Sequence, residues 1–193
     1  MATDRQAGAA HGLAGVACAL QAAGAYLDDP GLTLRAQGMR DRVAHLGPAG
    51  EVGWCRGAAG LAMCGLPDAL WLEPLVRGAR EHVAARHPDA SLCHGLLGIA
   101  DCMLTMARRR ADLAHLRGLA EWVAEESART LPCPGWPCGA GRETPGLLAG
   151  LAGIGLTYLR LADPTVPSPL EMSCPAAAPA ITDTSARREP VEC

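Results

Sequence analysis

The amino-acid sequence predicts an all-α protein built from helical hairpins. Hydrophobic residues make up 49% of the 193 residues, whereas aromatic residues make up only 3% and Phe is absent. A core of Leu, Ala, Val and Met favours helices over strands. A second observation is a Gly-x-x-Gly pair that occurs four times, and a third is the helical spacing of apolar residues between these pairs.

Each Gly-x-x-Gly pair leads into a run of small apolar residues, which is typical of a buried helix. The four segments are "HGLAG" from His11, "RGAAG" from Arg56, "HGLLG" from His94 and "AGLAG" from Ala149. The stretches at 70–86 and 111–130 are predicted to be amphipathic outer helices; in the second, apolar residues recur at three- and four-residue steps, namely Leu113, Leu116, Ala120, Val123 and Ala124. The leading glycines stand roughly 40–55 residues apart, which suits one hairpin per repeat.

Charge and cysteine content narrow the function classes. A formal net charge of −3 argues against a surface for nucleic acid or anionic membrane, and the longest uncharged apolar stretch, 146–159, is too short for a convincing membrane span. The start of the chain has no apolar core of signal-peptide type. An odd number of cysteines, nine, without such a signal favours reduced thiols and metal binding over disulfides. We therefore expect a cytoplasmic protein.

The repeat register predicts a metal site. Two positions before the leading glycine stand Ala10, Cys55, Cys93 and Leu148, and one position before it stand His11, Arg56, His94 and Ala149. If the hairpins wrap around an axis, equivalent positions converge at one end of it. Cys55, Cys93 and His94 would then meet, with His11 on the preceding repeat. Two thiolates and an imidazole suit zinc, and three protein ligands leave a fourth position open for substrate.

The remaining cysteines are assigned to other places. Cys18, Cys64 and Cys102 lie inside apolar runs and are interpreted as small buried core residues. Cys133 and Cys138, in "PCPGWPC", could hold a metal, but no second nearby pair completes that site. The helical repeats are assigned to residues 1–165, and a tail rich in Pro, Ala and Ser, expected to be disordered, to residues 166–193.

These motifs resemble a known family. "GWCRGAAG", "SLCHGLLG" and "PGLLAGLAGIGLTYLRLADPTVPSPL" are similar to the lanthionine synthetase C-like cyclases, and more narrowly to the C-terminal cyclase domain of class II lanthipeptide synthetases, over about residues 8–170. The resemblance implies an α/α toroid with a central zinc ion. It also implies an activity, the addition of a cysteine thiol of a precursor peptide to dehydroalanine or dehydrobutyrine, which forms a thioether ring. His11 matches a histidine of such cyclases and is the candidate for proton transfer.

The chain also departs from the family's pattern. Arg56 stands where relatives commonly have Tyr or His, and it is a second candidate catalytic residue because an arginine there could hold a carbonyl or carboxylate. Glu51 stands where some relatives have an arginine, and Ile99 stands where relatives often have a polar residue. About four of the family's seven hairpins are present, and the upstream aspartate near the zinc and a dehydratase domain are missing. The sequence therefore predicts a partial ring, which is either a truncated product or is completed by a second chain or a dehydratase partner.

Two further functions are weighed against a zinc-dependent cyclase. One is a non-catalytic module of the same fold that binds zinc or a thiol peptide without forming rings, and the missing repeats favour it. The other is a glycosidase, since α/α toroids also host such enzymes. A glycosidase would need paired carboxylates at the starts of the inner helices. Those positions hold Cys, His, Arg and Ala, so this function ranks low.

Overall fold

A computed structural model describes residues 7–47, 50–86, 89–130 and 143–171. All regular structure in these ranges is helical, which confirms the predicted all-α class. The α-helices are α1 (Leu13–Leu27), α2 (Pro30–Leu46), α3 (Ala58–Met63), α4 (Leu72–Ala84), α5 (Leu96–Arg109), α6 (Leu116–Thr130) and α7 (Leu151–Ala162). Two short 3₁₀ turns, η2 (Asp68–Leu70) and η3 (Ala111–Leu113), precede α4 and α6.

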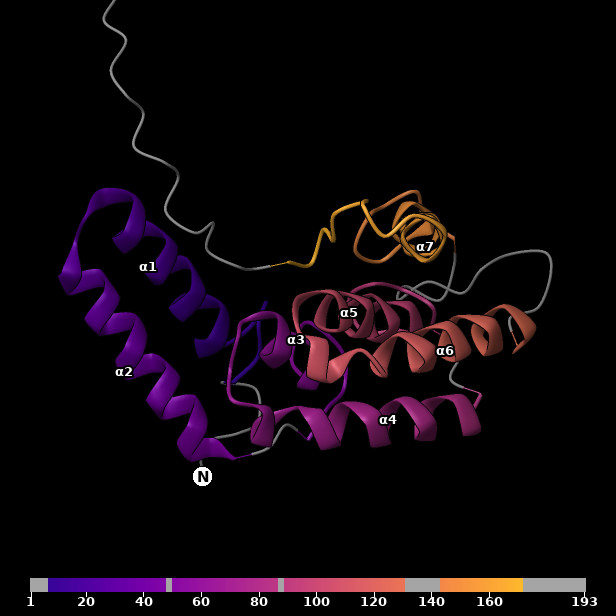
Figure 1. Cartoon of the computed structure of the whole chain (residues 1–193), viewed down its shortest axis with the longest axis horizontal. Coiled ribbons are helices and arrows are strands. Elements are labelled where there is room, and N and C mark those ends of the chain that lie inside the picture. Colours follow the sequence, from indigo (N-terminus) through magenta and orange to yellow (C-terminus); the bar gives the residue numbers. More distant parts are fainter. Residues whose placement is uncertain (1–6, 48–49, 87–88, 131–142, 172–193) are drawn as a thin grey trace, which may run out of the picture.

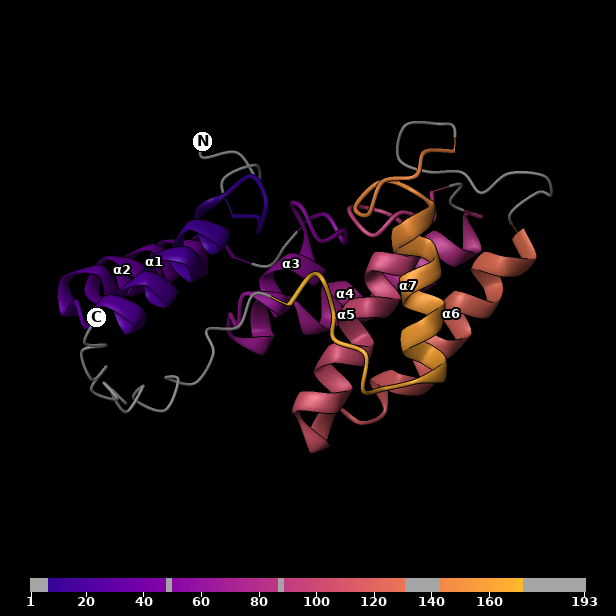
Figure 2. The same ribbon diagram turned by 90° about the horizontal axis from the view of Figure 1, so that it is seen from above.

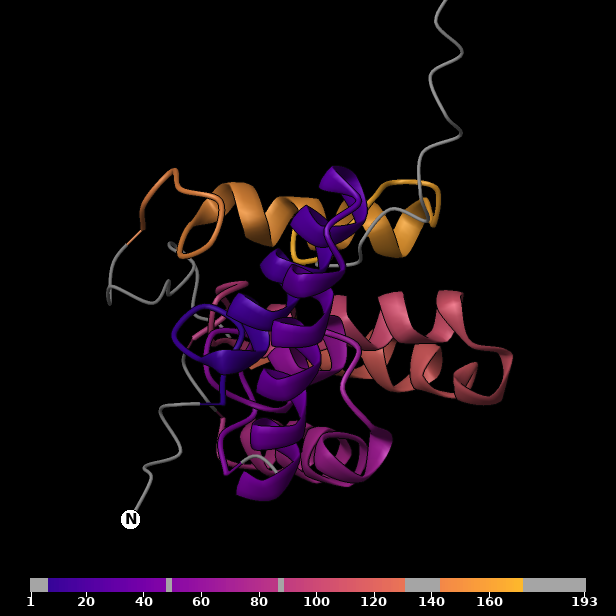
Figure 3. The same ribbon diagram turned by 90° about the vertical axis from the view of Figure 1, so that its left-hand side faces the viewer.

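The helices form hairpins that follow one another along an open arc. Helices α1 and α2, α3 and α4, and α5 and α6 pack as pairs, while α5 also contacts α3 and α7. The α1–α2 hairpin lies at one end of the arc and α7 at the other (Figures 1 and 2), and Figure 3 shows α7 above α5 and α6. The alternation of inner helices α1, α3, α5 and α7 with outer helices is that of an α/α toroid, of which the described residues form a part.

The two central inner helices, α3 and α5, form the most buried part of the fold, whereas α1 and α7 are only partly buried. Every residue of α3 is buried, as is every residue of α5 from Leu96 to Met106. The five apolar positions predicted for the outer helix at 111–130 are also all buried, with at most 3% of each residue exposed. The predicted core cysteines Cys18, Cys64 and Cys102 lie in the same apolar core. None of the described helices combines the length and apolar character that crossing a membrane requires.

A ladder of backbone hydrogen bonds joins equivalent positions of the four repeats. Ala10 N–H donates to the carbonyl of Cys55 (3.0 Å), Cys55 N–H to that of Cys93 (3.1 Å), and Cys93 N–H to that of Leu148 (2.8 Å). The loops that precede the inner helices therefore lie side by side, along the upper edge of the molecule in Figure 2. The predicted convergence of the inner-helix starts is confirmed. The ladder spans the arc and fixes the register of the repeats.

The second glycine of each pair lets the loop fold back over its own helix. A Cβ at this position would lie only 1.8–2.0 Å from a carbonyl oxygen six residues earlier; the pairs are Gly15 and Ala9, Gly60 and Trp54, Gly98 and Leu92, and Gly153 and Leu147. None of the four inner helices has a side-chain cap. Instead, loop carbonyls accept hydrogen bonds from the first helical N–H groups, as Asp89 does from Leu96 at 2.9 Å. Only glycine allows this close approach.

Replacing Gly98 with Ala is expected to destabilise the protein by about 1–3 kcal/mol, because the new methyl group collides with the Leu92 carbonyl and the backbone must shift. Gly155→Ala is the matched control in α7, since nothing lies within 4 Å of a Cβ there. It should instead stabilise by about 0.5–1 kcal/mol through the better helix propensity of Ala. Urea unfolding of both variants measures the difference, and equal effects would contradict the role assigned to the repeated glycines.

A buried polar cluster ties α5 to α7 and to the segment that follows α7. The carboxylate of Asp101 pairs with the Arg160 guanidinium and accepts a hydrogen bond from Ser168. Arg160 also donates to Thr105 Oγ1 (3.0 Å) and to the carbonyl of Val166 (3.1 Å). The side chains of Asp101 and Arg160 are 0% and 3% exposed. The cluster satisfies the hydrogen-bonding groups of two charges in the core.

The segment after α7 packs against the basic end of α5. Arg108 and Arg109, in the last turn of α5, both form ion pairs with Glu171. Leu170 is fully buried in the core. Residues 166–171, assigned to a disordered tail from composition, therefore belong to the packed part. The rest of that tail, and Cys133 and Cys138, lie outside the described residues.

Candidate metal centre

Two neighbouring loops bring together the three side chains that the sequence predicts as metal ligands. Cys55 precedes α3, and Cys93 and His94 precede α5. Their ligand atoms, the two sulfurs and a ring nitrogen, all lie within 4.8 Å of one another. The hydrogen bond from Cys55 N–H to the Cys93 carbonyl joins the two loops directly. A Cβ at Gly53 would lie 2.8 Å from the His94 Cα, so glycine there permits the close contact of the loops.

The group is buried on one side and open on the other. Cys55 is buried, Cys93 is half-buried, and 45% of the His94 side chain is exposed. Access from solvent is therefore from the side of His94, at the edge of the molecule where the inner helices begin (Figure 2).

The two thiols share a proton. The pKa of Cys55 is lowered from 9.0 to about 6, mainly because the Cys93 thiol donates a hydrogen bond to its sulfur, with smaller contributions from His94 and Arg56. The pKa of Cys93 is raised, because its proton is held in this hydrogen bond and because the group is partly buried. The hydrogen bond therefore favours the thiolate form of Cys55 and the thiol form of Cys93. A thiolate is the form that binds metals.

A carboxylate that the sequence analysis did not single out contacts the third ligand. Asp89 Oδ2 lies 3.1 Å from His94 Nε2, and Asp89 Oδ1 accepts a hydrogen bond from Ser91 N–H at 2.7 Å. Only the position of Asp89 in the sequence could have indicated that it lies at the site. Asp89 stands six residues before a leading glycine, in the loop that the repeat register already assigned to the site.

The two candidate catalytic residues lie on the exposed side of the loops. Arg56 is exposed, and its positive charge lowers the pKa values of both Cys55 and Cys93. His11 is also exposed and follows Ala10, whose N–H donates to the Cys55 carbonyl. The His11 side chain lines an open groove of about 660 Å³ together with Gly12, Leu13, Val16 and Arg42, among others. The ladder thus places the His11 loop beside the loop of Cys55 and Arg56, and both residues lie outside the group of three candidate ligand atoms.

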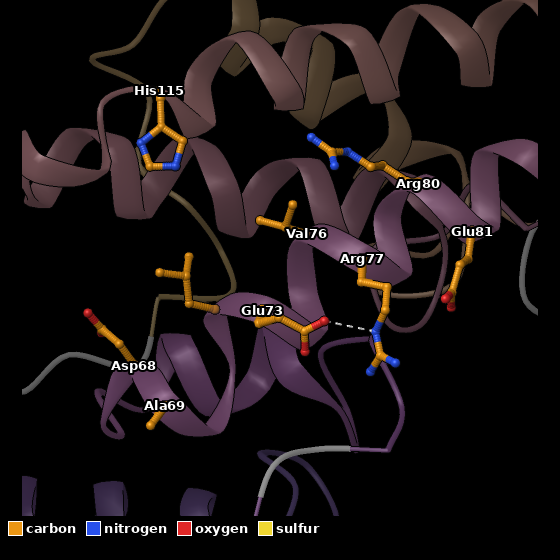
Figure 4. A pocket seen from close by; sticks show the side chains of 9 residues that line it. Asp68, Ala69, Glu73, Val76, Arg77, Arg80, Glu81 and His115 are labelled. Atoms are coloured by element: carbon orange, nitrogen blue, oxygen red, sulfur yellow. Dashed lines mark ion pairs between the residues drawn. The ribbon is translucent and has the colours of Figure 1, made fainter.

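Another groove lies away from the three candidate ligands. It has a volume of about 710 Å³ and runs along the outer helix α4, beside His115 (Figure 4). Its lining includes the exposed ion pair between Glu73 and Arg77, 3.2 Å apart. None of the ligand or candidate catalytic residues lines it. The candidate site is therefore identified by the chemistry of its converging side chains.

Comparison with known proteins identifies the family. No curated protein is similar enough to the chain to count as a match. A family model described as "Lanthionine synthetase C-like protein" matches residues 2–171, which include all the helices and loops described above. The narrower similarity to class II synthetases stays a prediction, because the match is to the family as a whole. The chain belongs to the lanthionine synthetase C-like family.

Proposed function

We propose that this protein is a zinc-dependent lanthipeptide cyclase-like enzyme. It would add a cysteine thiol of a precursor peptide to a dehydroalanine or dehydrobutyrine and so form a thioether ring. The observation that carries the proposal is the convergence of Cys55, Cys93 and His94 within 4.8 Å, in a chain that belongs to the lanthionine synthetase C-like family. This function accounts for the repeat register, since only the two adjacent loops of the second and third repeats carry cysteines at this position.

The residues present fit zinc. Two sulfurs and one imidazole are a donor set that zinc prefers, and three protein ligands are typical of a catalytic site that keeps one position open. Cys55 would bind as a thiolate without prior deprotonation at neutral pH, because its pKa is about 6. When bound, zinc at such a site lowers the pKa of a substrate thiol and so supplies the nucleophile.

His11 and Arg56 would transfer a proton and stabilise negative charge, respectively, when this nucleophile adds to the alkene. Addition forms a bond between the substrate sulfur and the β-carbon of the alkene, and the electron pair moves to an enolate that takes a proton at the α-carbon. His11 is the proposed proton donor, supported by its place in the loop beside Cys55. The Arg56 guanidinium, whose charge already acts on both thiols, would stabilise the enolate oxygen.

The substrate peptide and the protein partner are also proposals. The proposed substrate is a precursor peptide with dehydrated Ser or Thr and free Cys, and the open side of the site and the groove beside His11 are the surfaces that could receive it. A second chain that supplies further hairpins is the proposed partner at the ends of the arc. In support, the large apolar side chains that stay exposed in the described ranges all lie in the first hairpin or around α7: Val16, Tyr26, Leu27, Leu34, Leu147, Leu148, Leu151 and Leu159. The cytoplasmic location also remains a prediction.

Metal analysis of the purified chain tests the proposal. We expect about one zinc ion per chain, and a loss of this zinc in Cys93→Ala, because removal of one of three protein ligands leaves too few to retain the ion. Cys102→Ala is the control, since Cys102 is a fully buried core cysteine of α5 outside the group of ligand atoms. A Cys93→Ala protein that keeps its full zinc content would contradict the assignment of the site.

A further inference from the structure

We propose that Asp89 is a positioning residue for His94. Its carboxylate fixes the ring orientation and the proton of His94, so that one ring nitrogen stays available as a metal ligand. The inference rests on the proposed function and extends it from the three ligands to the residue that orients one of them. Three observations carry it: the contact with Nε2, the fixed position of the carboxylate, and the comparison with the equivalent position of the preceding repeat.

The Asp89 carboxylate is held at both oxygens. Oδ2 lies 3.1 Å from His94 Nε2, and Oδ1 accepts the Ser91 N–H at 2.7 Å. Only 12% of the Asp89 side chain is exposed, against 45% for His94. The acid is therefore fixed to the loop that carries Cys93 and His94. The more exposed imidazole of His94 thus contacts a carboxylate that is held in place.

This contact selects the tautomer of His94. A neutral imidazole carries one proton on either of its two nitrogens, and the other nitrogen then offers a lone pair. A carboxylate only accepts hydrogen bonds, so the 3.1 Å contact requires the proton on Nε2. The lone pair is then on Nδ1, which becomes the nitrogen that can bind a metal. Histidine ligands commonly donate their other N–H to a carboxylate in this way.

Comparison with the preceding repeat separates the role of the Asp89 side chain from that of the Asp89 backbone. Glu51 stands four residues before Cys55, as Asp89 stands four residues before Cys93. Both backbone carbonyls accept the first helical N–H of the following helix, at 2.9 Å in each case. Capping of the helix therefore uses the backbone in both repeats. The contact with His94 is made by the Asp89 side chain.

Zinc affinity of the full chain, measured by competition with a chelator, tests the proposal. In Asp89→Asn the amide oxygen can still accept the Ser91 N–H, but the amide NH₂ then faces Nε2 and favours the tautomer with the proton on Nδ1. We expect zinc binding to weaken by about 10- to 100-fold. Glu51→Gln is the matched control, because it removes one negative charge at the equivalent position, and its zinc affinity should equal that of the wild type.

The tautomer of His94 in the zinc-free protein gives a second readout that a merely structural role would not move. Nitrogen-15 NMR should show the proton mainly on Nε2 in the wild type and a shift towards Nδ1 in Asp89→Asn. Wild-type affinity in Asp89→Asn, or a wild-type His94 with its proton on Nδ1, would overturn the proposal. The NMR result on the wild type decides even if the variant does not fold. A wild-type chain that binds no zinc would instead contradict the proposed function, and the tautomer would still test the role of Asp89.

Discussion

Replacing Cys93 with Ala is expected to reduce the consumption of peptide thiols to the rate of the uncatalysed reaction. A free cysteine has a pKa near ~8.5, so only a few per cent of it is thiolate at neutral pH. Without Cys93 the site loses one of the three proposed zinc ligands and the hydrogen bond that lowers the pKa of Cys55. The measurement is the loss of free thiol from a dehydrated, cysteine-containing peptide, with zinc present and a sample without protein for reference.

The control and the alternative outcome separate a cyclase from a binding module. Cys102→Ala should retain the wild-type rate, because this thiol is fully buried in α5. Rapid thiol loss with Cys93→Ala would show that the reaction does not depend on the site described here. A wild-type chain that binds zinc and peptide but leaves the thiols free would instead support the non-catalytic module.

Replacing Asp101 with Ala should destabilise the protein by about 3–5 kcal/mol, because it leaves the Arg160 charge in the core without its partner. The pair lies between α5 and α7, so its loss weakens the packing of the fourth inner helix on the third. Burial raises the pKa of Asp101 and the Arg160 charge opposes this shift, so the ionised carboxylate depends on Arg160. The measurement is the free energy of unfolding in urea.

Two further variants test whether charge burial explains this effect. The exposed pair between Arg117 and Glu121, 2.9 Å apart with both side chains 46% exposed, is the surface control, and Glu121→Ala should cost at most about 0.5 kcal/mol. In the double variant Asp101→Ala with Arg160→Met, no unpaired charge remains buried. Its loss of stability should be smaller than the sum of the two single losses. Additive losses would show that the ionic contact itself does not matter.

The repeat register made the fold class and the convergence of the candidate ligands accessible from sequence. The glycine pairs can be recognised directly in the sequence, and Cys55 and Cys93 each stand two residues before the first glycine of a pair. The structure supplies the reason, since those positions are joined by backbone hydrogen bonds that do not depend on side-chain type. The metal-binding role of these residues and the catalytic roles of His11 and Arg56 stay predictions.

Other features of the fold depend on contacts that the repeat pattern of the sequence does not predict. Asp101 and Arg160 are 59 residues apart in the chain, and each alone would be interpreted as a surface charge. Inner helix α3 has only six residues because Gly65 adopts a positive φ of 67° and Pro67 follows, although its apolar run resembles the others. Residues 166–171 have the composition of a tail, yet the buried Leu170 and the ion pairs of Glu171 fix them to α5.

The backbone ladder repeats the backbone arrangement of the candidate metal centre along the arc. Cys93 N–H donates to the Leu148 carbonyl just as Cys55 N–H donates to the Cys93 carbonyl, so the third and fourth loops are related as the second and third are. Introducing Leu148→Cys and Ala149→His would give the fourth loop the residues that the third loop now has. In evolutionary terms, a duplicated hairpin inherits the backbone position of a candidate ligand before it carries the ligand side chain, because the hydrogen bonds of the ladder do not involve side chains.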